Sequence, residues 1–270
     1  LELLDIFIEL NSHIGQYFYS AYFETFDTDE DHQKLETLIR IHVRGCQILE
    51  EINVLIKNGF ADGAMARWRS LHELSATFLF LYNNNHEEVK MYNDYEIIES
   101  WKKAKEFNEY TVKLGWEPIP DEEILELENL RKDVIEKYGN DFSSSYGWTM
   151  NVLPKGRRNI REIEKHVGLT ELRGIYTWAS ENVHSGISGN IKRLGLPVEH
   201  EDEFLSGPSE VGFTDPVQFA TYSLFEMTHT LLQMNPTILN SAYSIVLENL
   251  QNAVVESFSK AEKKYPKIGG

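Results

Sequence analysis

The chain has 270 residues, of which 43 are Asp or Glu and 26 are Lys or Arg, so its formal net charge is −17. This charge disfavours a sequence-independent grip on DNA or anionic lipid. A hydrophobic fraction of 41% excludes wholesale disorder. The single cysteine, Cys46, cannot form an intramolecular disulfide, and no apolar run approaches the ~20 residues of a membrane span. We therefore expect a cytoplasmic protein that has no membrane partner, with Cys46 buried.

Apolar residues recur at three- and four-residue steps through most of the chain, and this periodicity predicts an all-α fold. Asn58-Gly59 and Gly115 are typical helix stops. The expected helices, in chain order, cover about 3–22, 31–57, 60–82, 87–113, 121–138, 159–166 and 170–184, then one that starts at 215 and one that follows Pro236 to about 263.

Two stretches rich in Gly, Pro and Ser, at about 140–158 and 185–214, predict long loops. Loops of this length inside a compact domain are usually functional or disordered. No internal repeat is evident. We predict one domain over residues 1–270, a multi-helix bundle with its core at about 31–263.

The third expected helix carries ionisable side chains where the helix should be buried. At 100° per residue, Arg69, His72 and Glu73 share one face, whereas Arg67 points nearly opposite to Arg69. Buried charges are costly unless they are paired, so Arg69 and Glu73 should bond to each other or to neighbouring helices. They form either a structural ion pair or one face of a functional site.

A second polar stripe lies on the helix expected at 170–184. Arg173, Tyr176, Ser180 and His184 follow one another at three- and four-residue steps and therefore line one face. The alternative is that His184 caps the helix end and that Tyr176 is an ordinary core tyrosine.

Further patterns suggest other chemistry with less force. Ser180 and His184 lack the surroundings of a hydrolase nucleophile. Two Glu-x-x-His spacings, ending at His184 and His229, match di-iron ligand sets, but solvated helix faces explain them as well. We therefore expect no metal and no other cofactor.

One basic cluster stands out against the acidic background: Lys155, Arg157, Arg158 and Arg161, close to Trp148. Cations next to an aromatic ring suit a phosphodiester backbone. The alternative is a solvated turn that neutralises the acidic helices around it.

Several of these residues resemble the pattern of a bacterial helical family, domain-of-unknown-function family 5677. The similar segments are Gly59-Phe60, Arg69-Ser70-Leu71-His72-Glu73, Tyr176, Ser180 and Val183-His184-Ser185-Gly186, within about 31–234. The resemblance implies a bacterial or phage-related cytoplasmic context. It marks Arg69, Glu73, Tyr176, Ser180 and His184 as the polar signature, and it supplies no reaction.

A looser resemblance is to the HEPN superfamily of helical ribonucleases, whose signature is an Arg separated by four to six residues from a His. Arg67 and His72 have that spacing. In that chemistry the His transfers protons at the ribose 2′-OH and the leaving oxygen, and the Arg stabilises the charge on the phosphate. A continuous helix would place Arg67 and His72 about 140° apart.

Together these patterns lead to one functional hypothesis, a toxin or abortive-infection type defence effector that acts as a metal-independent endoribonuclease. The catalytic candidates are Arg69, His72, Glu73, Tyr176, Ser180 and His184, and the substrate-binding candidates are Arg67, Arg157, Arg158, Arg161 and Arg173. RNA is then the expected partner. The alternative is a non-catalytic module that binds a small ligand, a partner protein or a second copy of the chain through a polar pocket.

Overall fold

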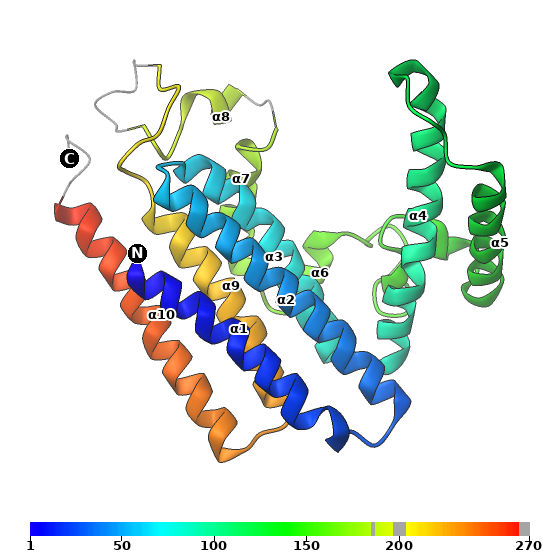
Figure 1. Ribbon diagram of the computed structural model, residues 1–270, viewed down its shortest axis with the longest axis horizontal. Coiled ribbons are helices and arrows are strands. Elements are labelled where there is room, and N and C mark those ends of the chain that lie inside the picture. The colour runs from blue at the N-terminus through cyan, green and yellow to red at the C-terminus, as the bar shows by residue number, and fades with distance from the viewer. Residues whose placement is uncertain (185–186, 197–203, 265–270) are drawn as a thin grey trace. The chain divides into compact units, whose positions relative to one another are not determined.

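A computed structural model describes residues 1–184, 187–196 and 204–264 (Figure 1). The described residues fold into helices and turns, and none of them forms a strand, so the predicted all-α class is confirmed. The chain divides into two compact units. The bundle unit comprises Leu1–Asn83 and Glu164–Gly270, and the hairpin unit comprises Asn84–Ile163. The single domain expected from the sequence stays a prediction.

Five long helices make up the bundle unit and run side by side in Figure 1. α9 packs against all four others, so it is the central helix. The helix predicted at 31–57 starts two residues earlier, at Asp29. Thr28 is its N-cap, because the Thr28 side chain accepts a hydrogen bond from the backbone N–H of Asp31. The bounds are α1 Glu2–Tyr22, α2 Asp29–Lys57, α3 Ala61–Asn83, α9 Thr214–Gln233 and α10 Ile238–Lys264.

The bundle core is filled by large apolar side chains from all five helices. Trp68, Phe78 and Phe80 on α3 are fully buried, which agrees with the expectation that this helix is buried. Burial of one such side chain contributes about 1.5–3 kcal/mol, so these α3 residues add substantially to the stability of the bundle unit.

A polar cluster is enclosed where α1, α2 and α9 meet. The Thr228 hydroxyl donates to Asn11 Oδ1 at 2.6 Å, so His42 Nε2, 2.8 Å away, must donate to Thr228. Full burial lowers the pKa of His42 to about 4, which keeps the imidazole neutral. Cys46 is buried as predicted, with its sulfur 3.9 Å from His42 Nδ1. A Cβ on Gly15 would lie 2.7 Å from the same ring, so this position needs glycine.

Short helical segments complete the bundle unit: the end of α6 (Ile160–His166), the 3-10 turn η4 (Thr170–Leu172), α7 (Arg173–Glu181) and α8 (Ile187–Ile191). The helix expected at 170–184 therefore begins with a 3-10 turn, and its α-helical part ends three residues early. Its last turn tightens: Asn182 N–H bonds to Ala179 and Val183 N–H to Ser180, both three residues back.

The loop expected at 185–214 contains α8, and its part at 185–186 and 197–203 lies outside the described residues. After α8 the chain is tied to the first turn of α3. The Asp62 carboxylate accepts the backbone N–H of Leu194 at 2.8 Å and that of Gly195 at 3.2 Å. Arg193 is paired with the same carboxylate.

The hairpin unit is built on α4 (His86–Leu114) and α5 (Asp121–Tyr138), both close to their predicted bounds. The loop predicted at 140–158 has no α-helix, but it contains the 3-10 turns η2 (Asn140–Ser143) and η3 (Gly147–Thr149). Phe142 lies at the centre of an aromatic cluster, with Tyr95 and Tyr138 at ring-centroid distances of 5.6 and 4.6 Å.

Among the described residues, no helix combines the length and the apolar character that crossing a membrane requires.

Candidate functional site

The two polar stripes predicted from the sequence meet in the bundle unit. Arg69 and Glu73 on α3 form an ion pair of 3.1 Å, and the Tyr176 hydroxyl on α7 donates to Glu73 at 2.5 Å. The Arg69 guanidinium lies 5.0 Å from the centroid of the Tyr176 ring, and that of Arg173 lies 4.6 Å from it. One tyrosine thus joins both stripes through its hydroxyl and its ring.

Beneath this contact lies a buried carboxylate with two hydrogen-bond donors. His72 Nε2 is 3.0 Å from Glu164 Oε1, and the two side chains are 0% and 1% exposed. Arg173 donates to both oxygens of the same carboxylate, at 3.1 and 3.3 Å. Burial would raise the pKa of Glu164, but hydrogen bonds from His72 and Arg173 outweigh burial and hold that pKa below its usual range. Glu164 is therefore a carboxylate, and His72 donates to it from Nε2.

Burial and the neighbouring charged groups together decide the protonation state of Tyr176. Burial, followed by the hydrogen bond to Glu73, raises the pKa of Tyr176 to about 12, although Arg69 acts in the opposite direction. The phenol is therefore a hydrogen-bond donor near neutral pH and cannot serve as a base.

Ring contacts extend from this network across α3. His72 packs on Tyr176 at a centroid distance of 5.6 Å, Trp68 on His72 at 5.2 Å, and Phe219 on Trp68 at 5.3 Å. The indole N–H of Trp68 also donates to Ser223 on α9 at 3.1 Å. This aromatic row of Tyr176, His72, Trp68 and Phe219 connects α7 with α9.

Three other predicted residues lie apart from the network. α3 is continuous through Ala61–Asn83, so Arg67 faces α2, where it pairs with Glu51. The Ser180 hydroxyl donates to the backbone carbonyl of Tyr176 at 2.8 Å, one turn back. His184 lies beyond the end of α7, and its side chain is exposed. Arg67 and His72 therefore do not come together, and the Ser180 hydroxyl is already engaged by a backbone carbonyl.

The basic cluster belongs to the hairpin unit. Lys155 pairs with Asp141 at 2.8 Å, and Arg158 lies 3.8 Å from the same carboxylate and bonds to two backbone carbonyls. Arg157 and Arg161 are exposed. Asp141 therefore neutralises part of the cluster. No group of three or more His, Cys, Asp or Glu side chains suited to a metal ion occurs in the described part of the chain.

Sequence reasoning missed a cavity of about 620 Å³ beside the aromatic row. Three segments far apart in the sequence form it: η4 with the turn before it, α9 and α10. We call it the polar cavity. It is lined by Gly168, Leu169, Glu171, Leu172, Gln218, Phe219, Tyr222, Gln251, Asn252, Val255, Glu256, Ser259, Lys260 and Lys263.

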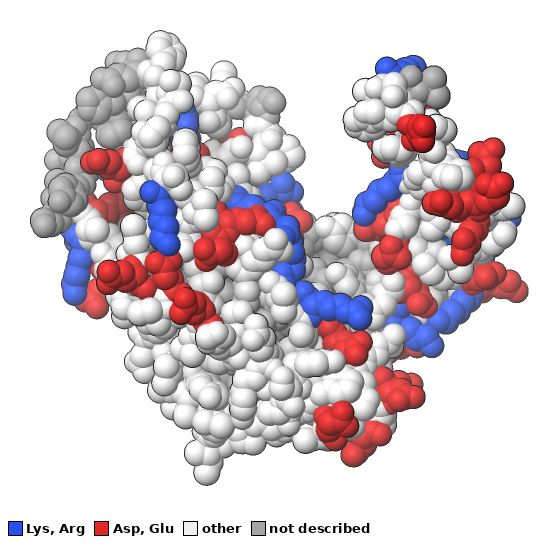
Figure 2. Space-filling model, viewed as in Figure 1, with Lys and Arg blue, Asp and Glu red and all other residues white. Residues whose placement is uncertain are grey.

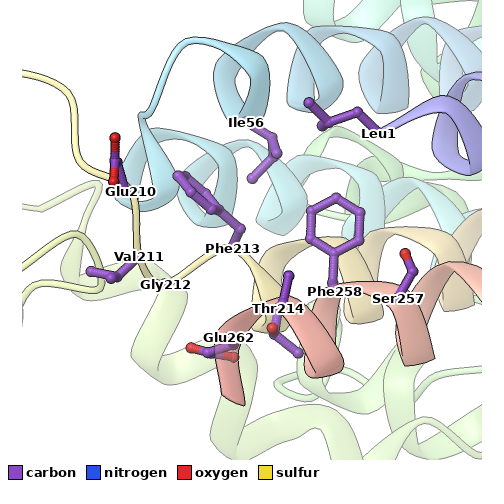
Figure 3. Close-up of a pocket in the computed structure, with 11 residues that line it drawn as sticks. Leu1, Ile56, Glu210, Val211, Gly212, Phe213, Thr214, Ser257, Phe258 and Glu262 are labelled. Atoms are coloured by element: carbon purple, nitrogen blue, oxygen red, sulfur yellow. The ribbon is translucent and has the colours of Figure 1, made fainter. Parts of the chain in front are cut away.

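A smaller cavity of about 220 Å³ lies in the bundle unit on a different face of the same C-terminal half of α10 (Figure 3). Its apolar lining includes Ile56, Phe213 and Phe258, and the carboxylates of Glu210 and Glu262 lie at its edge. Its volume falls below the roughly 300–1,000 Å³ of typical ligand pockets, whereas the polar cavity lies within that range.

The polar cavity and the buried network share a structural element. Leu172 lines the cavity, and Arg173, the next residue, is held by Glu164. Phe219 lines the cavity, and its ring packs on Trp68 at the end of the aromatic row. The network therefore fixes two of the cavity walls.

Comparison with known proteins places the chain in a family. The model of the Family of unknown function (DUF5677) matches residues 35–204, more than half of the chain, so the chain belongs to this family. The match includes both polar stripes and confirms the resemblance to family 5677. No curated protein and no solved structure matches the chain significantly. The HEPN resemblance stays a hypothesis.

Replacement of Glu164 tests the buried network. Glu164→Gln removes the charge that Arg173 and His72 share, and we expect it to lower the free energy of unfolding by about 3 kcal/mol at pH 7. The pKa of Glu164 is lower in the folded state than in the unfolded state. The stability difference between wild type and variant is therefore complete above pH 4.5, the unfolded value, and it disappears as the pH falls through the folded pKa. Urea unfolding at several pH values measures the size of this difference and its pH dependence.

The matched control is Glu99→Gln, which breaks the exposed Lys103–Glu99 pair of 3.3 Å. We expect it to cost less than about 0.5 kcal/mol. Equal losses in the two variants would contradict the role assigned to Glu164.

Proposed function

We propose that this chain is a non-catalytic helical module that binds a small ligand in the polar cavity. The observation that carries the proposal is a space of about 620 Å³ in the bundle unit, lined by the aromatic rings of Phe219 and Tyr222, by side-chain amides, and by both Lys and Glu side chains. Concave sites of this size with a few polar groups are the usual ligand sites of proteins.

The lining indicates the chemistry of the ligand. Phe219 and Tyr222 offer ring faces and are half-buried, as is the amide of Gln251. Lys260 and Lys263 are exposed, and Lys260 is paired with Glu256, another lining residue, at 2.6 Å, so Lys263 is the cation assigned to the anionic group of the ligand. A planar ring with hydrogen-bonding substituents and one anionic group fits this set. Nucleoside monophosphates have that chemistry.

The Tyr222 hydroxyl is suited to donate to such a ligand. Burial, followed by the negative charges of Glu226 and Glu171, raises the pKa of Tyr222. The phenol therefore stays protonated, and a protonated phenol donates one hydrogen bond and can also accept.

The buried network supports binding better than catalysis. A general acid or base must reach the proton that it transfers. His72 is 0% exposed and Glu164 is 1% exposed, so neither reaches a molecule in solution. Their role in the proposal is to hold η4 and Phe219, two walls of the cavity, in place before the ligand arrives.

Titration calorimetry with AMP, GMP, CMP and UMP tests the proposal on the full chain. We expect saturable binding of at least one monophosphate, and a loss of about tenfold in affinity for Gln251→Ala, which removes an amide contact. Lys263→Ala should lower the affinity for the monophosphate and leave the affinity for the corresponding nucleoside unchanged.

The control is Lys192→Ala, an exposed lysine outside the cavity, which should bind as the wild type does. Absence of saturable binding by all four monophosphates, or equal affinity of all variants, would contradict the proposal.

A defence effector that cuts RNA without a metal is the second candidate, and one observation favours it. The His72 imidazole is oriented by a carboxylate that also binds Arg173, as general acid–base histidines are. Arg69 and Arg173, 25% and 32% exposed, are the cations through which a phosphate would approach.

Incubation of the purified chain with total RNA in EDTA tests this second candidate. It predicts cleavage that falls about 10²-fold in His72→Ala and in His184→Ala. His184 is exposed, so its variant separates lost chemistry from lost folding, and His13→Ala, an exposed histidine on α1, should cleave normally. Intact RNA, or equal cleavage by every variant, would exclude it.

A further inference from the structure

The hairpin unit exposes a row of large apolar side chains where α4 ends. Phe107, Tyr110 and Leu114 follow at three- and four-residue steps on one face of α4, and they are 39%, 46% and 57% exposed. Trp116, just beyond the helix, is 58% exposed and stacks on Phe107 at a centroid distance of 5.9 Å. We call these four residues the hairpin tip.

The geometry of the hairpin tip is held by the chain itself. The Asn108 side chain accepts the backbone N–H of Ile119 at 2.8 Å and donates to its carbonyl at 3.0 Å. This pair of bonds closes the turn that carries Trp116. A patch whose residues are positioned in advance loses less entropy when a partner binds.

Packing within the hairpin unit leaves the tip uncovered. α4 contacts α5 through Trp101, whose ring lies 4.2 Å from the Arg131 guanidinium, and Ala104 and Thr111 are buried on a neighbouring face. Large apolar side chains that are exposed next to one another mark interaction sites, and Trp, Tyr and Phe are the residue types enriched there.

The charge around the tip selects the partner. Residues 106–128 contain eight Asp or Glu and a single cation, Lys113, which gives a local net charge of −7. Figure 2 shows acidic side chains crowded along α5. This charge repels nucleic acid, anionic lipid and a second copy of a chain whose own charge is −17. It attracts a cationic partner.

We propose that the hairpin tip is a docking surface for a basic amphipathic helix of a partner protein. The apolar face of that helix packs on Tyr110, Leu114 and Trp116, and its Lys and Arg residues pair with the surrounding carboxylates. Helices with one apolar and one basic face are recognised in this way by apolar surfaces with acidic rims. The inference concerns the hairpin unit alone and does not depend on the ligand proposed for the polar cavity.

The probe is a fluorescent amphipathic peptide of Leu and Lys, about 18 residues or five helical turns long, titrated with the full chain and followed by anisotropy. We expect saturable binding, and a loss of about tenfold in affinity for the double variant Tyr110→Ser, Leu114→Ser. A Leu and Glu peptide with the same apolar face should not bind.

The matched control is Ile245→Ser, Val246→Ser on α10, which removes two aliphatic residues that are 58% and 51% exposed. It should bind as the wild type does, and circular dichroism confirms that both double variants are folded. No binding of the Leu and Lys peptide, equal affinities of the two double variants, or self-association that the tip variant abolishes would overturn the proposal.

Discussion

A buried carboxylate, Glu164, is the constraint on which the arrangement of the candidate site depends. Removing such a charge from water costs several kcal/mol, and only well-placed partners repay it. Here the partners come from two helices, His72 on α3 and Arg173 on α7. α3, the end of α6 and the start of α7 must therefore keep one arrangement, and the turn η4 between α6 and α7 is fixed with them.

The consequence of this constraint reaches the polar cavity by two routes. Along the chain, Arg173 holds Leu172 of η4 against the cavity. Through space, the aromatic row links the position of His72 to that of Phe219, which lines the cavity. The same buried groups that look catalytic in the sequence thus serve, in our account, as the rigid support of a binding site.

Much of the fold could be predicted from the sequence, because long amphipathic helices have a strong period and clear stops. α5 has its predicted bounds, Asp121–Tyr138. The Arg69–Glu73 ion pair is one of the pairings expected from the cost of burying charge, whereas the bond from Tyr176 to Glu73 did not follow from that cost. The central role of Glu164 could not be predicted, because this residue lies among charged residues of a short helix and nothing in its local sequence indicates burial. The polar cavity escaped notice since three distant segments form it.

Amide hydrogen exchange of Glu164→Gln against wild type tests most directly whether the buried carboxylate holds the cavity wall. The account predicts that amides in residues 168–176 exchange about tenfold faster in the variant, while those of α10 that line the cavity keep their protection. Unchanged exchange in residues 168–176, or the same acceleration in every helix of the bundle unit, would contradict it.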